Sequence, residues 1–187
     1  MPLFQSVKQD WETPPSLLEQ LYPAFPFDLD VCASRANVKA GVFFSPEDDG
    51  LSRAWRGLCW CNPPYSDVGK WIGKAKQEAE AGAVVLCLAF ARTDTRWWQD
   101  NIPSASVVTF VRGRLKFSGM GPATAPSALF MFGEPTPEQV AALSRWGWTV
   151  RQIKQGPRRC FAGGFDTGGY TRAHFGLTRL PRLDTFR

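Results

Sequence analysis

The sequence predicts one compact α/β domain with a mostly parallel sheet and helices on both faces. Segments typical of strands alternate along the chain with segments typical of helices, which is the pattern of a sheet covered by helices. Residues 83–90 form a continuous apolar run, as expected of a strand buried on both faces of a parallel sheet. The chain of 187 residues is long enough for one such domain with a sizeable core, and we expect that domain to span residues 1–150.

The first predicted elements are short. Thr13 and Pro14 indicate the start of a helix, with Thr as the N-cap and Pro at the first helical position. The leucines that follow, Leu17, Leu18 and Leu21, would share one face of this helix. Residues 27–33 are expected to form a strand, although the segment contains two carboxylates. A short strand is expected at 42–44, and the apolar run 58–61 stops at two prolines.

A clear helix follows, because apolar residues recur at helical spacing from Val68 to Ala79. Ser66 or Asp67 caps this helix, and Gly82 ends it. The remaining elements, in chain order, are the strand at 83–90, a helix at 95–101, strands at 106–111 and 127–132, and a last helix near Val140, Leu143 and Trp146 that begins at the capping box of residues 136–139.

The net charge of +5 is unevenly distributed. From Arg145 to the C-terminus nine Lys or Arg residues accompany two Asp residues, whereas the rest of the chain carries slightly more acidic than basic residues. Because aromatic residues are interleaved with these charges, we interpret residues 151–187 as a basic, Gly- and Arg-rich appendage that contacts a polyanion such as nucleic acid. Arg158 and Arg159 are its candidate contacts. A solvated tail is the alternative interpretation.

The five cysteines are scattered, and no pair has the spacing of a zinc site. Most of them lie in apolar segments, where free Cys behaves as a small hydrophobic residue. The sequence therefore predicts no metal site and a reducing, cytoplasmic location. We also expect no membrane association, because the sequence has neither a signal-peptide pattern nor an apolar stretch long enough to span a bilayer.

The tetrapeptide Asn62-Pro63-Pro64-Tyr65 carries the strongest chemical signal. It follows an apolar strand and precedes a helix, and ligands of open α/β sheets bind beyond the carboxyl ends of the strands. The amino group of a ring such as adenine is a poor nucleophile, because its lone pair is delocalised. The side-chain carbonyl of Asn62 and the backbone carbonyl of Pro63 would accept its two hydrogens and free that lone pair to attack a sulfonium methyl group.

The other residues of the tetrapeptide fit the same chemistry. The prolines stiffen the turn and remove competing N–H donors. Tyr65 offers a flat face for an extruded base, and such stacking contributes about 1–3 kcal/mol per base. The alternative interpretation is a proline-stiffened turn with a capping Asn and a core Tyr.

The tetrapeptide resembles the Asp/Asn/Ser-Pro-Pro-Tyr/Phe/Trp signature of amino-group methyltransferases, and the wider chain resembles the phage-type DNA N6-adenine methyltransferase (Dam) family. The matching segments keep their order, and the resemblance covers roughly residues 10–132: Trp11-Glu12-Thr13-Pro14, Leu29-Asp30-Val31-Cys32-Ala33, Asp48-Asp49-Gly50-Leu51, Cys61-Asn62-Pro63-Pro64-Tyr65, Lys70-Trp71 and Arg112-Gly113-Arg114-Leu115-Lys116-Phe117. The resemblance implies the Rossmann-like fold of S-adenosylmethionine-dependent methyltransferases. The implied enzyme methylates adenine N6 of a flipped-out base in double-stranded DNA. It also implies a phage or prophage origin, and hence the cytoplasm of a bacterial host.

The resemblance further implies a cofactor site. Asp30, at the end of the first strand, would accept a hydrogen bond from the amino group of S-adenosylmethionine, and Asp49 would bond the ribose or the adenine amino group. For Asp49, a plain turn acid is an equal alternative. The first strand lacks the glycine-rich loop that usually follows it in this fold, and Cys32-Ala33-Ser34 stands in its place. The candidate cofactor residues are Trp11, Thr13, Asp30, Cys32, Ala33 and Asp49.

Arg112, Arg114 and Lys116 alternate along the end of a predicted strand, so that their side chains share one face. We interpret them as phosphate contacts, which give salt-dependent affinity without sequence information. An edge strand protected by charge is the alternative.

Two other functions remain open at this stage. The same enzyme class would serve a cytosine N4 amino group, an RNA base or a protein glutamine. Outside enzymes, the chain would be a basic DNA-binding module with a methyltransferase-like fold that no longer catalyses.

Overall fold

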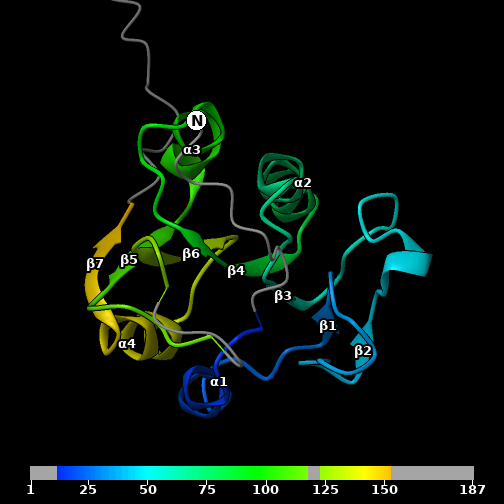
Figure 1. The fold of residues 1–187 in the computed structure, drawn as a ribbon, viewed down its shortest axis with the longest axis horizontal. Helices are drawn as coiled ribbons and strands as arrows, with labels where there is room; N and C mark the ends of the chain where they lie inside the picture. The colour runs from blue at the N-terminus through cyan, green and yellow to red at the C-terminus, as the bar shows by residue number, and fades with distance from the viewer. Residues whose placement is uncertain (1–11, 118–122, 153–187) are drawn as a thin grey trace, which may run out of the picture. The chain divides into compact units, whose positions relative to one another are not determined.

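A computed structural model describes residues 12–117 and 123–152. Within these residues the chain forms a seven-stranded sheet with the order β2-β1-β3-β4-β6-β5-β7 (Figure 1). The strands are β1 (Leu29–Asp30), β2 (Val42–Phe43), β3 (Leu58–Cys61), β4 (Val84–Phe90), β5 (Val107–Val111), β6 (Ser127–Phe132) and β7 (Gly147–Arg151). The helices are α1 (Pro15–Leu21), α2 (Val68–Glu80), α3 (Arg96–Asn101) and α4 (Pro137–Ser144), with short 3-10 helices η1 (Pro46–Asp48) and η2 (Ile102–Ser104).

The expectation of a mostly parallel sheet is wrong for one half of it. The pairings β1–β2, β1–β3 and β3–β4 are parallel, whereas β4–β6, β5–β6 and β5–β7 are antiparallel. In the described part of the segment between β5 and β6 no helix intervenes, and strands joined without a crossover helix pair in the antiparallel sense. The sheet is therefore mixed, with β6 and β7 opposing the other strands.

Helices cover both faces of the sheet, as predicted. Figure 1 shows α2 and α3 on one face and α1 and α4 on the other. The buried strand β4 serves both layers, because its side chains alternate. Leu86 and Leu88 pack in the cluster that includes α1 and α4, while Val85 and Cys87 pack in the cluster that includes α2 and α3.

The helix boundaries differ in detail from the prediction. Pro14, not Thr13, occupies the N-cap of α1, and the cap makes no side-chain hydrogen bond. The predicted capping box of α4 is confirmed, since the Thr136 hydroxyl accepts the Gln139 N–H and the Gln139 side chain accepts the Thr136 N–H. β7 was not predicted from the sequence, and it reaches Arg151, one residue beyond the expected end of the domain.

The strand directions place four loops at one edge of the sheet. Because β1, β3, β4 and β5 all run the same way, their carboxyl ends share that edge. Asp30, Asn62, Arg92 and Arg112 lie at or just after these ends. In the described ranges, no helix has the length and apolar character needed to cross a bilayer.

Candidate active site

A cavity of about 380 Å³ opens at the carboxyl ends of β1 and β3. This volume is typical of small-molecule and cofactor sites. Eight of the predicted cofactor-binding and catalytic residues lie in its wall: Thr13, Asp30, Cys32, Ala33, Asp49, Asn62, Pro63 and Pro64. The cavity therefore brings five of the six proposed cofactor residues together with the start of the tetrapeptide. Trp11, Arg158 and Arg159 lie outside the described residues.

Asn62 is half-buried, directly after the last residue of β3. Its amide nitrogen donates a hydrogen bond of 3.1 Å to the Thr13 hydroxyl, which comes from the buried segment before α1. In this arrangement the nitrogen points to Thr13, and the bond holds the amide group against the segment before α1. Thr13 thus holds Asn62 in addition to lining the cavity.

Tyr65 is not among the residues that line the cavity, and it packs against the core cluster that includes α1 and α4. Its half-buried ring stacks on Phe90, at the end of β4, with a centroid distance of 4.2 Å and an interplanar angle of 21°. Phe117 meets Phe90 edge-on at 6.3 Å. Burial raises the pKa of the Tyr65 phenol, with the Arg92 charge acting in the opposite sense, so the ring stays neutral. The aromatic group is thus braced by the sheet.

Asp30 is 2% exposed and reaches the cavity wall. Its carboxylate accepts the backbone N–H of Lys39 at 3.0 Å and that of Cys32 at 3.4 Å. Burial raises the pKa of Asp30 to about 6, against the lowering effect of these two bonds and of the Lys39 charge. Lys39 also lines the cavity, so a carboxyl group and an ammonium group lie close together in its wall.

Cys32 stands where a glycine-rich loop usually follows the first strand of this fold, and its thiol packs against a second cysteine. Cys32 contacts Cys61 at the end of β3, and Cys61 lies opposite Cys87 on β4. The pKa of the Cys32 thiol is raised by its hydrogen bond with Cys61 and by burial, and burial raises that of Cys61. Protonated thiols are poor nucleophiles, so these cysteines act as packing residues, with Cys32 in the cavity wall and Cys61 behind it.

The two neighbouring acids Asp48 and Asp49 have different roles. The Asp48 carboxylate accepts the Ser45 backbone N–H at 2.9 Å and the Ser45 hydroxyl at 2.7 Å, and so caps η1. Asp49 lies in the left-handed region at φ 49° and lines the cavity. A β carbon added at Gly50 would lie 2.2 Å from the Val31 carbonyl oxygen, so only glycine fits there. Asp49 lies in the cavity wall and also begins a turn closed by Ser52, so its role toward a cofactor stays a prediction.

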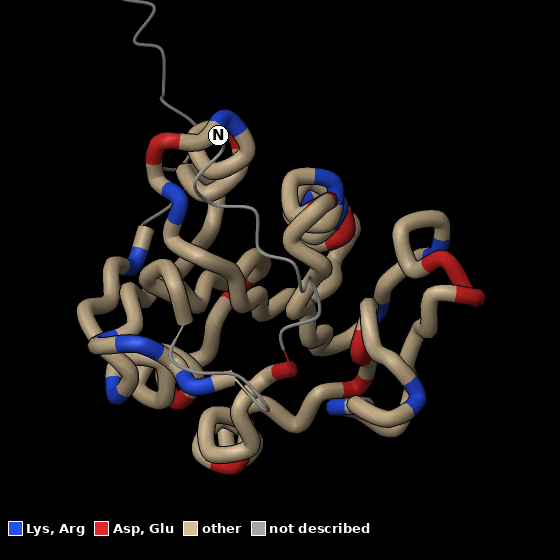
Figure 2. Tube along the Cα trace, viewed as in Figure 1, with Lys and Arg blue, Asp and Glu red and all other residues tan. Residues whose placement is uncertain are grey.

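Arg112, Arg114 and Lys116 are all exposed and follow the carboxyl end of β5. Figure 2 colours the basic positions of the chain blue. The three residues do not form one regular alternating face, because β5 ends at Val111 and the chain turns at Gly113, where φ is 74°. β5 lies between β6 and β7, so protection of an edge strand is not their role.

Three residues of this region were missed in the sequence. Lys39 lies between two short strands, where no pattern marks it. Trp71 belongs to the predicted apolar face of α2, and that pattern does not reveal that its 9% exposed ring also lines the cavity. Phe90 ends the apolar run of β4, and only the parallel pairing of β3 with β4 brings it to Tyr65.

Comparison with known proteins gives a family. The model of the DNA N-6-adenine-methyltransferase (Dam) family matches residues 2–129, which include the whole cavity wall and the segment after β5. Similar proteins include the DNA N-6-adenine-methyltransferase of Haemophilus phage HP1, 31% identical over 57% of this chain, and that of Escherichia phage T1, 28% identical over 59%. The matches cover 64% and 48% of those two proteins, so this chain spans less than two thirds of either. From the family match over most of its length, the chain belongs to the DNA N-6-adenine-methyltransferase (Dam) family.

Proposed function

We propose that this protein transfers a methyl group from S-adenosylmethionine to adenine N6 in double-stranded DNA. The family and the names of the two phage relatives support this reaction. The observation that carries it is the placement of Asn62 and Pro63 in the wall of a cofactor-sized cavity, at the carboxyl edge of the sheet.

The cavity suits S-adenosylmethionine. Its amino-acid end carries an ammonium and a carboxylate, and Asp30 and Lys39 offer the opposite charges at one end of the cavity. Asp49 and Trp71 also line it, and they offer a hydrogen-bond acceptor and a flat ring for the nucleoside end. When bound, the cofactor supplies an electrophilic methyl group on a positively charged sulfur.

The protein's own residues act on the adenine. The Asn62 side-chain carbonyl and the Pro63 backbone carbonyl accept the two hydrogens of the amino group, which concentrates the nitrogen lone pair. Thr13 holds the Asn62 amide in place through the 3.1 Å bond. Tyr65, stacked on Phe90, provides the aromatic surface against which the base lies. A target base must leave the duplex to reach such a site, at a cost of a few kcal/mol.

Exposed basic residues at the same edge supply the affinity for DNA. Arg112, Arg114 and Lys116 follow β5, and phosphate contacts of this kind hold the duplex without reading its sequence. The basic segment of residues 151–187, including Arg158 and Arg159, is proposed to add further contacts.

Two measurements on an Asn62→Ala variant test the proposal. Titration calorimetry with S-adenosylmethionine should give a dissociation constant within about three-fold of wild type, because Asn62 acts on the base. Methyl transfer to unmethylated genomic DNA should fall by a factor of about 100 or more, in the range of losing a group that stabilises the transition state.

Asn101→Ala in α3 is the matched control, since it removes the same group outside the cavity wall, and it should leave both measurements unchanged. Normal transfer by Asn62→Ala would refute the proposed role of the tetrapeptide. A wild-type protein that binds the cofactor and DNA but transfers nothing would be a non-catalytic binding module. Label on cytosine, RNA or protein would move the reaction to another amino group.

A further inference from the structure

The loop that carries Asp49 to the cavity has little regular structure of its own. It runs from the end of η1 to the start of β3. Asp49 has a left-handed backbone, and Ser52 closes the turn after it by donating both its N–H and its hydroxyl to the Asp49 carbonyl oxygen, at 2.9 and 2.8 Å. A non-glycine residue in this conformation is retained only where its surroundings hold it. The contacts of the loop with the rest of the protein therefore decide where Asp49 lies.

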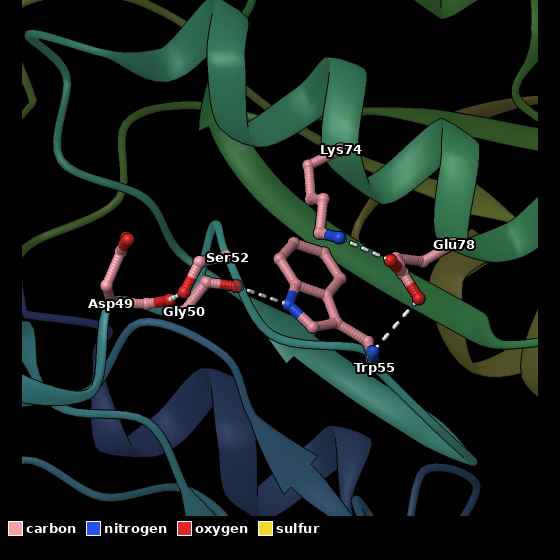
Figure 3. Close-up of polar contacts among 6 residues, drawn as sticks. All are labelled: Asp49, Gly50, Ser52, Trp55, Lys74 and Glu78. Atoms are coloured by element: carbon pink, nitrogen blue, oxygen red, sulfur yellow. Dashed lines mark hydrogen bonds and ion pairs between the residues drawn. The ribbon is translucent and has the colours of Figure 1, made fainter.

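Trp55 supplies one such contact. Its 3% exposed indole donates a hydrogen bond of 2.8 Å to the Gly50 carbonyl oxygen (Figure 3). Its ring also stacks with Trp71 at a centroid distance of 6.1 Å and an interplanar angle of 22°. Gly50 and Trp71 both line the cavity, so one buried side chain touches two parts of its wall.

Glu78 on α2 holds Trp55 in turn. One carboxylate oxygen accepts the Trp55 backbone N–H at 2.9 Å, and the other pairs with Lys74, whose ammonium lies 6.0 Å from the centre of the Trp55 ring (Figure 3). The side chains of Glu78 and Lys74 are only 13% and 19% exposed. Burial alone would raise the pKa of Glu78, but Lys74 and the Trp55 N–H hold it below its usual value, so the carboxylate is charged.

We propose that Glu78 and Trp55 are positioning residues, which hold the Asp49–Gly50 wall in the conformation that binds the nucleoside end of the cofactor. Neither residue touches the cavity, and each acts through a hydrogen bond to the next. This inference rests on the proposed function, because it assumes that the cavity binds S-adenosylmethionine. It predicts that breaking the chain of contacts weakens cofactor binding and leaves the affinity for DNA unchanged.

The test compares Glu78→Ala, Glu78→Gln and Trp55→Phe with wild type by calorimetry with S-adenosylmethionine. Trp55→Phe keeps an aromatic ring but leaves the buried Gly50 carbonyl without its donor, so the dissociation constant should rise about ten-fold. Glu78→Ala should have a similar effect, and Glu78→Gln a smaller one, because an amide oxygen still accepts the Trp55 N–H. Glu80→Ala changes an exposed acid on the same helix and should bind as wild type does.

A double-mutant cycle separates positioning from general destabilisation. If Glu78 acts through Asp49, then adding Glu78→Ala to Asp49→Ala should weaken binding by less than about two-fold, because the contact that it positions is already gone. Hydrogen exchange of residues 49–57 in the free protein should speed up in Glu78→Ala and not in Glu80→Ala. The KM for the cofactor should rise while kcat at saturation stays within about two-fold.

The two proposals fail in different ways. Wild-type affinity in both Trp55→Phe and Glu78→Gln, or full additivity with Asp49→Ala, overturns the positioning role while methyl transfer by wild type still stands. If Glu78→Ala does not fold, Trp55→Phe and Glu78→Gln decide alone. A wild-type protein that does not bind S-adenosylmethionine overturns both proposals together.

Discussion

Replacing Gly50 with alanine is a direct test of the cavity wall. The new β carbon would lie 2.2 Å from the Val31 carbonyl oxygen, and 3.1 and 3.3 Å from two carbons of the Trp71 ring. Contacts this short do not persist, so the end of β1, the Asp49 loop or Trp71 must move. Gly50 does not have a positive φ, so the effect comes from crowding and not from backbone strain.

The size of the effect follows from the cost of overpacking. Added carbon in a tightly packed site costs about 1–3 kcal/mol, which corresponds to a melting temperature lower by roughly 2–10 °C for a chain of this size. Because every group able to move lies in or next to the cavity wall, the affinity for S-adenosylmethionine should fall by about ten-fold or more. The measurements are differential scanning calorimetry of the free protein and titration calorimetry with the cofactor.

Gly41→Ala is the matched control, because its β carbon would have no atom within 4 Å. It should melt within about 2 °C of wild type, since alanine in a compatible conformation is neutral or slightly stabilising. A Gly50→Ala protein with wild-type stability and wild-type cofactor affinity would show that the Asp49–Gly50 loop is not packed as described.

Three further predictions concern charge and stacking. Asp30 has a folded pKa of about 6, above its ordinary value, so cofactor affinity measured by calorimetry should fall as the pH drops below 6, and Asp30→Asn should abolish that dependence. Because the unfolded chain loses this proton first, the stability of the free protein should decrease by about 2 kcal/mol as pH rises from 4 to 6, relative to Asp30→Asn. Tyr65→Phe should keep kcat/KM for DNA within a few-fold of wild type, because the stack on Phe90 remains. Tyr65→Ala should lose about 1–3 kcal/mol of base stacking while its affinity for the cofactor is unchanged. Equal activity in the two variants would exclude stacking on Tyr65. Arg112→Gln and Arg114→Gln should each reduce the salt slope of DNA binding by about 0.9, equally for all sequences, and an unchanged slope would remove them from the interface.

Local patterns predict much of the fold and of the site. The apolar strand before Asn62, the helical spacing after Asp67 and the capping box at Thr136 depend on neighbours in sequence, and the structure agrees with each. The placement of Asn62 in a cavity follows from the rule that ligands bind at the carboxyl ends of strands. These features require only short-range physics.

The features that sequence reasoning missed depend on contacts between distant segments. The insertion of β6 between β4 and β5, and the edge strand β7, are decided by pairing. The short β7 is mostly exposed, and its apolar residues Trp148 and Val150 do not face the core. Lys39 reaches the cavity through contacts between segments, namely the pairing of β1 with β2 and the bond of its backbone N–H to Asp30. Asp48 and Asp49 look alike in sequence, and only the cap formed with Ser45 separates them.

The most direct test of the proposed reaction uses S-adenosylmethionine with a deuterated methyl group and unmethylated double-stranded DNA. After digestion to nucleosides, mass spectrometry should find the three deuterium atoms on N6-methyldeoxyadenosine with the wild-type protein, and none above background with Asn62→Ala. Label on another nucleoside, or equal labelling by the two proteins, would contradict the assignment of the Asn62 turn as the centre of adenine methylation.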